Sequence, residues 1–394
     1  MTDPLLPPDL RALQAEAAEF ARRLRSAAAA LEWEPDPRQR VPWDLVEEAS
    51  AKGWRTLGLP RDWGGGGASV LALCVLVEEL AAGDMGFAVL LDQTLKVQRI
   101  LARLAGPGAR ARVQERFLPD PRGVLAVCFT EPETGSDYVL PHPGFRFATT
   151  ARQHPDGSFT LSGTKRFISN GADACLLVVF ACTDPGQSAE SGTSAFLVEP
   201  DLPGVEVERI HEKISQRTIN NATLRFHDTP LEPWRLLGPL HRGFGSAREI
   251  LKESTIEAAA TTLGTARAAY ELALAHARAR VQGGGPLADH ANVQARLGQM
   301  HAQLEAARSL IWRAALAVED ESYDHRLGAS AKLVAADIAV AVCLSAMELH
   351  GGLAIMRDEA AIERCLRDCL SFLHSDGAQD TLALRIARAS LGAS

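Results

Sequence analysis

The chain has 394 residues, of which 46% are hydrophobic and 23% are charged. It is therefore long enough for two or three domains with substantial cores, and its composition argues against a disordered or low-complexity protein. Asp and Glu number 49 against 41 Lys and Arg, a formal net charge of −8, so we expect no nucleic-acid partner.

Residues 1–120 predict a helical domain. The first ten residues, MTDPLLPPDL, lack the basic and apolar regions of a signal peptide. Four helices are expected: one capped by Asp9, one with Pro42 in its first turn, one restarted by Ser69 and ending near Gly83, and one reaching about Ala105.

Residues 121–235 predict a β domain. Short runs rich in Val, Phe, Thr and Leu are expected as strands at 124–129, 145–150, 159–162, 175–182, 194–199, 205–210 and 223–227. Asp156-Gly157 is a hairpin signal, and residues 183–193 read as a polar loop. Several short strands without helices between them predict a small barrel or sandwich.

Residues 236–394 are rich in Ala, Leu and Arg and predict a helical bundle. The glycines before Pro286 and the pair Gly351-Gly352 interrupt long helical patterns. The apolar runs 174–181 and 333–347 are too short or too rich in alanine to cross a bilayer, so no membrane span is expected.

The cysteines form no disulfide framework. They are scattered and odd in number: Cys74, Cys128, Cys175, Cys182, Cys343, Cys365 and Cys369. Although Cys365 and Cys369 lie one helical turn apart, no further ligands are nearby, so buried thiols are favoured over a metal site. We expect a cytoplasmic protein.

Two segments carry polar groups suited to binding a ligand. TEPETGSD, residues 130–137, follows a strand and combines a permissive glycine with several hydroxyls. LSGTKRFISNG, residues 161–171, places Phe167 before Ile168 and Ser169, which together could wall a planar ring. Alone, the first could be an ordinary loop and the second a strand with one buried ring.

Taken in order, these segments resemble the flavin-binding signatures of the acyl-CoA dehydrogenase family. GLPRDWGGGGAS, HARARVQGGGPLADHANVQ and the stretch from MELHGG to RIAR are similar to further family segments. The resemblance implies an N-terminal α-helical domain, a middle β domain and a C-terminal four-helix bundle, an α+β fold. It also implies FAD as the cofactor and a homodimer or homotetramer.

The resemblance assigns cofactor-binding roles residue by residue. Positions along the flavin are matched by Phe129, Thr130, Gly135, Ser136, Phe167, Ile168 and Ser169. Arg280 matches an arginine that reaches the FAD pyrophosphate of a neighbouring subunit, where a guanidinium suits phosphate oxygens. Gly352 matches a glycine close to that same cofactor, and Ala378 stands where the family has a threonine.

Asp376 falls where the family places its catalytic glutamate, although an aspartate before Gly377 could instead cap a helix. The substrate positions implied by the resemblance are Ser136, Ser254, Thr255, Gly377 and Asp92. Ser254 occupies the alternative base position of some relatives. Asp92 could also be a surface residue, and His374 could tune Asp376 or be solvated.

Several positions depart from the family pattern. Gly283-Gly284 replaces Phe-Gly, Glu348 replaces a glutamine, and no arginine follows Leu251 at the start of the bundle. Together with Ala378, these changes remove contacts expected at the adenine end of FAD and at the CoA pocket.

The expected reaction is α,β-dehydrogenation of an acyl thioester, with CoA or a carrier protein as the acyl carrier. A carboxylate would remove the α-proton while flavin N5 accepts the β-hydride. Two alternatives stay open: oxidase or oxygen-using biosynthetic chemistry on the same fold, and a flavin-depleted scaffold without catalysis. The electron acceptor and the acyl chain are not indicated.

Overall fold

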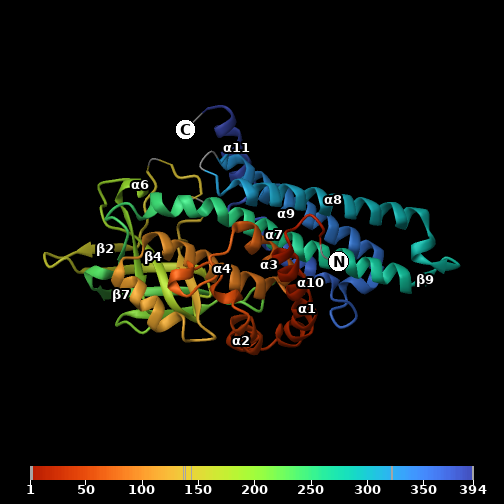
Figure 1. The fold of residues 1–394 in the computed structure, drawn as a ribbon, viewed down its shortest axis with the longest axis horizontal. Helices are drawn as coiled ribbons and strands as arrows, with labels where there is room; N and C mark the ends of the chain where they lie inside the picture. Colours follow the sequence, from red (N-terminus) through yellow and green to blue (C-terminus); the bar gives the residue numbers. More distant parts are fainter. Residues whose placement is uncertain (1–2, 136, 138, 143, 321–322, 393–394) are drawn as a thin grey trace.

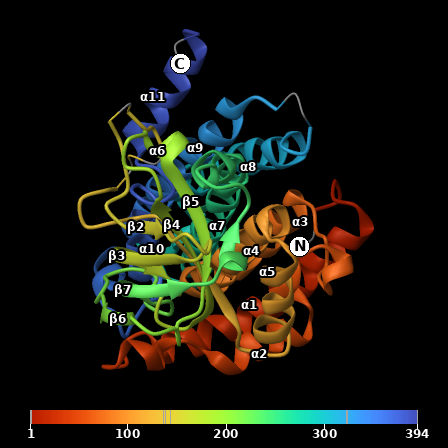
Figure 2. The same cartoon turned by 90° about the vertical axis from the view of Figure 1, so that its left-hand side faces the viewer.

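The computed structural model describes residues 3–135, 137, 139–142, 144–320 and 323–392, with the side chains of residues 248–251 outside that description. It contains an N-terminal helical group, a β domain and a long helical bundle, which lie against one another in Figures 1 and 2. The expected α+β architecture is confirmed.

The N-terminal helices lie beside the bundle. Their bounds are α1 (Pro8–Leu31), α2 (Trp43–Ala51), α3 (Val70–Gly83), α4 (Met85–Leu104) and α5 (Pro107–Arg112). Ser69 caps α3 by accepting a hydrogen bond from the Ala72 amide, as predicted. The prediction for Asp9 was wrong: α1 already begins at Pro8, so Asp9 lies in its first turn and caps nothing.

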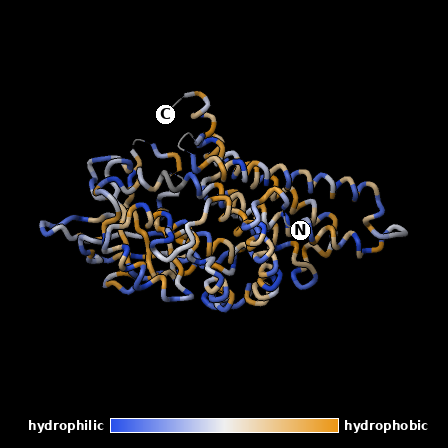
Figure 3. Tube along the Cα trace, viewed as in Figure 1, coloured by the Kyte–Doolittle hydropathy of each residue, from blue (hydrophilic) through white to orange (hydrophobic). Residues whose placement is uncertain are grey.

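The β domain is one eight-stranded mixed sheet in the order β6-β7-β3-β2-β4-β5-β8, with β1 paired parallel to β4. Its strands are β1 (Val124–Cys128), β2 (Thr150–Gln153), β3 (Phe159–Ser169), β4 (Ala174–Cys182), β5 (Thr193–Val198), β6 (Val205–Ile210), β7 (Asn221–Leu231) and β8 (Leu236–Leu237). The hairpin at Asp156-Gly157 joins β2 to β3 and protrudes as a hydrophilic tip (Figure 3).

Two expectations for this domain were wrong. The strand expected at 145–150 begins only at Thr150, because Phe145 and Phe147 lie in a loop and pack against Phe244. The loop expected at 183–193 contains a short helix, α6 (Ala189–Gly192).

The bundle begins after the sheet. Its helices are α7 (Gly243–Ala279), α8 (Ala291–Ala317), α9 (His325–His350), α10 (Ile362–Ser371) and α11 (Gln379–Ser390). The small hairpin of β9 (Val281–Gln282) and β10 (Gly285–Pro286) separates α7 from α8. The 37-residue helix α7 runs from the β domain to the far end of the bundle (Figure 1).

The segment His325–Ile355, which is α9 with the following short turn, is long and apolar enough to cross a membrane by length and composition. The sequence analysis considered only residues 333–347 within this segment. Half of its most apolar window is buried inside the fold, as expected of a helix at the centre of a bundle.

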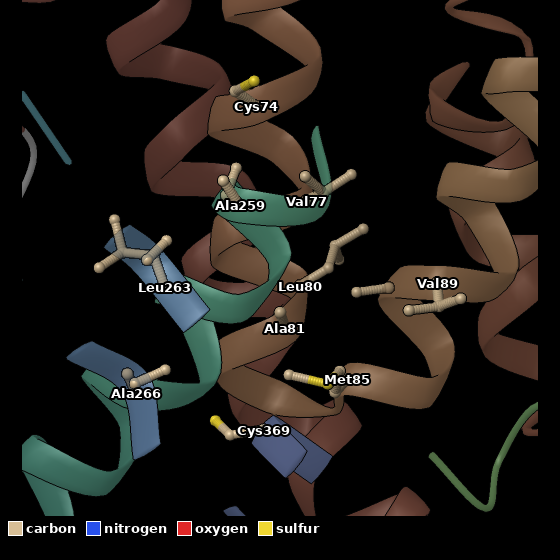
Figure 4. Close-up of a cluster of buried hydrophobic side chains, with 14 of the residues drawn as sticks. Cys74, Val77, Leu80, Ala81, Met85, Val89, Ala259, Leu263, Ala266 and Cys369 are labelled. Carbon is tan, nitrogen blue, oxygen red and sulfur yellow. The ribbon is translucent and has the colours of Figure 1, made fainter. Parts of the chain in front are cut away.

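The largest core joins the N-terminal helices to the bundle. Figure 4 shows side chains of α3, α4, α7 and α10 meeting there, among them Leu80, Met85, Leu263 and Cys369. Alanines on α7, such as Ala259 and Ala266, are fully buried and let the helices approach closely. This packing fixes α4 against α7, and the candidate site lies between those two helices and the sheet.

Candidate active site

A cavity of about 510 Å³ lies where the sheet, α4, α7 and the loop before α11 meet. It brings together residues that are far apart in sequence: Phe129, Thr130, Gly135, Phe167, Ile168, Ser169, Ser254 and Asp376. All eight were predicted as site residues. The cavity is large enough for part of a cofactor with a reacting group beside it.

The loop after β1 is held by a buried ion pair. Lys165 Nζ on β3 lies 2.8 Å from Glu131 Oε1 and donates to the Phe129 carbonyl at 3.0 Å. Glu131 also accepts the amides of Ala148 and Thr149. Both charged side chains are buried, so the pair fixes the backbone that presents Phe129 and Thr130 to the cavity.

The second wall is a strained turn of β3. Phe167 has a φ of 59°, unusual for an aromatic residue, and 49% of the residue is exposed. The side-chain Nδ2 of Asn221 donates to the Phe167 carbonyl at 2.9 Å and to Ser169 Oγ at 3.0 Å, which holds this conformation. The strain keeps an aromatic ring and a hydroxyl at the cavity wall.

Asp376 lies in a tight turn and points into the cavity. Its φ is 52° and that of Gly377 is 96°; aspartate and glycine tolerate this region better than other residues. Ser254 Oγ on α7 donates to Asp376 Oδ1 at 2.6 Å. The turn is also held by the buried Lys332, whose Nζ donates to the Gly377 carbonyl at 2.7 Å.

Behind Asp376 lies a buried charge cluster on α4 and α7. Lys96 Nζ is 2.6 Å from Asp92 Oδ2 and 3.7 Å from Asp376 Oδ1. Burial raises the pKa of Asp92 and raises that of Glu257 further, since the two carboxyls face one another. Only 1% of Asp92 is exposed, so the alternative that Asp92 is a surface residue was wrong.

A smaller chamber of about 140 Å³ shares several residues with the cavity, Asp376 among them. Most of its lining is polar: Asp92, Gln93, Ser169, Lys213, Ser215, Gln216, Asn221, Ser371, Ser375 and Asp376, against the apolar Val89 and Phe372. Burial lowers the pKa of Lys213 to about 7, and its Nζ donates to Asn221 Oδ1 at 2.6 Å.

Arg280 and Gly352 lie elsewhere, in a depression of about 820 Å³ at the far end of the bundle. Ser254 and Arg280 are separated by 26 residues along α7 and its cap, about 39 Å at 1.5 Å per residue. Glu348 lines the same depression and forms an ion pair with Arg296. Arg280 and Asp376 therefore do not serve one compact site within a single chain.

The remaining predicted residues lie outside the cavity lining or outside the described part of the chain. Thr255 is buried and donates to the Lys252 carbonyl, and Ala378 is the residue before α11. Gly377 lies in the turn of Asp376 without lining the cavity itself. Ser136 lies outside the described residues.

Sequence reasoning missed Lys96, Lys213 and Lys332, which surround Asp376 and the chamber. One signal was available for Lys96: it follows Asp92 by four residues, the spacing at which opposite charges on a helix pair with one another. His374 lines the cavity near Asp376 and is exposed, which agrees with the solvated histidine that the sequence also allowed.

The residues present fit a flavin. Phe129 and Phe167 offer aromatic walls, Thr130 and Ser169 offer hydroxyls at their edges, and Asp376 offers a carboxylate across the same cavity. Hydroxyl groups beside aromatic walls suit a planar ring that carries polar edges. The arrangement can hold a redox-active ring and place a base beside it.

Comparisons with known proteins agree with this reading. Residues 7–119, 126–229 and 241–391 match the family models described as the acyl-CoA dehydrogenase N-terminal, middle and C-terminal domains. The chain is 32% identical over 335 residues to the bovine mitochondrial short-chain specific acyl-CoA dehydrogenase, covering 84% of this chain and 79% of the relative.

Solved structures give the same result. Butyryl-CoA dehydrogenase from Megasphaera elsdenii superposes with a TM-score of 0.87 at 27% identity, over 99% of this chain and 100% of that one. A glutaryl-CoA dehydrogenase from Mycobacterium smegmatis in complex with FADH2 superposes with a TM-score of 0.88 at 26% identity, over 99% and 96% of the two chains.

Proposed function

The chain belongs to the acyl-CoA dehydrogenase family, and we propose that it removes the α-proton and β-hydride of an acyl thioester with Asp376 as the base. It is an oxidoreductase acting on CH–CH groups, and its cofactor is FAD. Bound FAD supplies the hydride acceptor. The protein contributes the base, the walls that orient the reactants, and the exclusion of water.

The observation that carries the proposal is the position of Asp376. Of the acids that line the main cavity among the described residues, Asp376 is held by Ser254 opposite the aromatic walls, whereas Glu212 is exposed and pairs with Arg40 and Arg217. A general base needs hydrogen-bond reach to the proton it removes and a fixed orientation. Asp376 has both the fixed orientation and access to the cavity.

The chamber beside Asp376 supports a short acyl group. Its volume of about 140 Å³ leaves space for only a few heavy atoms beyond the reacting carbons, and its lining is mostly polar. A long alkyl chain would leave these polar groups desolvated without partners. We therefore propose a short acyl thioester.

The far depression supports a shared cofactor site. We propose that Arg280 and Gly352 of one copy contact the FAD bound by another copy in a homodimer or homotetramer, because they lie too far from the cavity to serve the same chain's cofactor.

All seven cysteines are free, which supports a reducing compartment and the proposed cytoplasmic location.

The proposal is tested by mixing the FAD-loaded protein anaerobically with butyryl-, hexanoyl- and dodecanoyl-CoA and with the same acyl groups on a carrier protein. Flavin bleaching by the short thioesters and formation of the 2-enoyl product are expected. Absence of bleaching with every thioester contradicts the proposal. Rapid reoxidation of the bleached flavin by O2 would instead identify an oxidase, and a protein that takes up no FAD would identify a non-catalytic scaffold.

A further inference from the structure

Lys96 is a buried lysine at the inner wall of the cavity, and it touches the proposed base. We propose that Lys96 is a positioning residue that keeps the Asp376 carboxylate ionised and directed into the cavity, with Asp92 and Glu257 holding Lys96 in place. The inference rests on the proposed function, because it concerns the base of that same reaction.

The contacts of Lys96 are almost entirely electrostatic. Only 5% of the residue is exposed, and its Nζ lies 2.6 Å from Asp92 Oδ2 and 3.7 Å from Asp376 Oδ1. Nζ donates no hydrogen bond of regular geometry to any described residue. A buried ammonium persists only where opposite charge compensates its desolvation. The two aspartates supply that charge, so the position of Lys96 and that of Asp376 depend on each other.

Asp92 and Glu257 form an acid pair behind Lys96. Both are 1% exposed, and neither Asp92 Oδ1 nor either oxygen of Glu257 has an N–H or O–H donor among the described residues. The two carboxyls face one another, and burial raises the pKa of both, so the environment favours one proton shared by the pair. The pair then carries one negative charge, which balances the one positive charge of Lys96.

This charge count gives Asp376 a specific role. Lys96 lies between the acid pair and Asp376, so its positive charge stabilises the ionised Asp376 carboxylate as well as the pair. Transfer of the α-proton to Asp376 removes one of these negative charges and leaves Lys96 balanced by the acid pair. The cluster therefore accepts the proton without creating a new buried charge.

Other charged groups near Asp376 do not replace Lys96. Arg99 lies 3.8 Å from Glu257 and pairs with Glu253. Burial lowers the pKa of Lys332 to about 8 although the charge of Asp376 opposes this, and its hydrogen bonds go to the Gly377 carbonyl and to Gln379 Oε1 rather than to the Asp376 carboxylate. Four further titratable residues line the cavity: His211, Glu212, Lys213 and His374. Burial lowers the pKa of Lys96, but Asp376, Asp92 and Glu257 together raise it above its ordinary value, so Lys96 stays a cation across the assay range.

The test is the pH dependence of anaerobic flavin reduction in Lys96→Met. At 3.7 Å a unit charge favours the ionised carboxylate enough to move the acidic midpoint of the profile upward by about one to three pH units when the charge is removed. Lys96→Arg keeps the positive charge, so its midpoint should lie closer to that of the unmodified protein than the midpoint of Lys96→Met does. Lys52→Met, which removes a lysine paired with Glu16 on the surface, should leave the midpoint unchanged.

Lys96→Met leaves Asp92 buried without its partner and could unfold the protein, so Lys96→Gln, which removes the charge but can still donate a hydrogen bond to Asp92, is measured beside it. FAD absorbance and thermal unfolding establish that each variant is folded. A midpoint shift of less than 0.3 pH units (about twofold) in the folded Lys96→Gln variant overturns the inference.

An infrared titration separates this inference from the proposed reaction. The band of the protonated Asp376 carboxyl, identified by its loss in Asp376→Asn, reports ionisation without any substrate. If no thioester bleaches the flavin but the band shifts in the Lys96 variants, the proposed function is wrong and the role of Lys96 stands. If the thioesters bleach the flavin and neither midpoint moves, only the inference is wrong.

Discussion

Replacing Asp376 by asparagine tests the centre of the proposed mechanism with little structural change. Asparagine tolerates the positive φ of 52° as aspartate does, and its side-chain oxygen can still accept the Ser254 hydrogen bond. The variant loses only the charge and the ability to accept a proton. Its fold and its FAD content should therefore match those of the unmodified protein.

The expected loss in the rate of flavin bleaching follows from the role of Asp376 as a positioned base. General-base catalysis contributes about 10²- to 10⁴-fold, or about 2.7–5.4 kcal/mol of barrier. We expect the rate of anaerobic flavin bleaching by a short acyl-CoA, measured by stopped flow, to fall by that factor. A companion variant is Ser254→Ala, which keeps the carboxylate but removes one hydrogen bond to it, worth about 1.5–3 kcal/mol. It should slow bleaching by about 10- to 150-fold.

A rate in Asp376→Asn within tenfold of the unmodified enzyme would refute the reasoning, provided that FAD is retained. Asp92, the acid in the adjoining chamber, would then become the candidate base. Asp92→Asn under the same conditions would decide between the two carboxylates.

Three further outcomes are expected. Arg280→Ala should weaken FAD retention by about 10- to 150-fold through loss of a charged hydrogen-bond donor worth about 1.5–3 kcal/mol, measured by flavin fluorescence; unchanged retention would remove Arg280 from the site. Glu348→Gln should tighten FAD binding by freeing Arg296 for the phosphates, and unchanged affinity in the same assay would show that Glu348 does not face them. Glu131→Gln should lower the free energy of unfolding by about 3–5 kcal/mol in urea denaturation, since it leaves Lys165 buried without its counter-charge, and a loss below 1 kcal/mol (about fivefold) would contradict that account.

Local sequence signals predicted the structure correctly where it depends on interactions between residues close together in the chain. The Ser69 cap, the break at Gly83 and the Asp156-Gly157 hairpin all occur as expected. The strand expected at 145–150 failed because burial of Phe145 and Phe147 against α7 decides that loop, and no local pattern reports such a contact.

The candidate site divides in the same way. Motifs located Phe129, Ser169 and Asp376, because each lies in a segment whose residue order is itself distinctive. Lys96 was missed because its partner Asp376 is 280 residues away and meets it only once α4 packs beside the turn before α11. Thr255, also predicted at the substrate, does not line the cavity, since neighbouring residues on a helix face different directions: Ser254 donates to Asp376, whereas Thr255 donates to the Lys252 carbonyl.

The length of α7 has a consequence for how the protein must be handled. One end of this helix supports the cavity and the other end presents Arg280 in the far depression. In the proposed assembly each cofactor is held by two copies, so mass action links cofactor loading to the concentration of the protein itself. Dilution should release FAD and dissociate the assembly together, and the yellow colour of a preparation would then report its state of association.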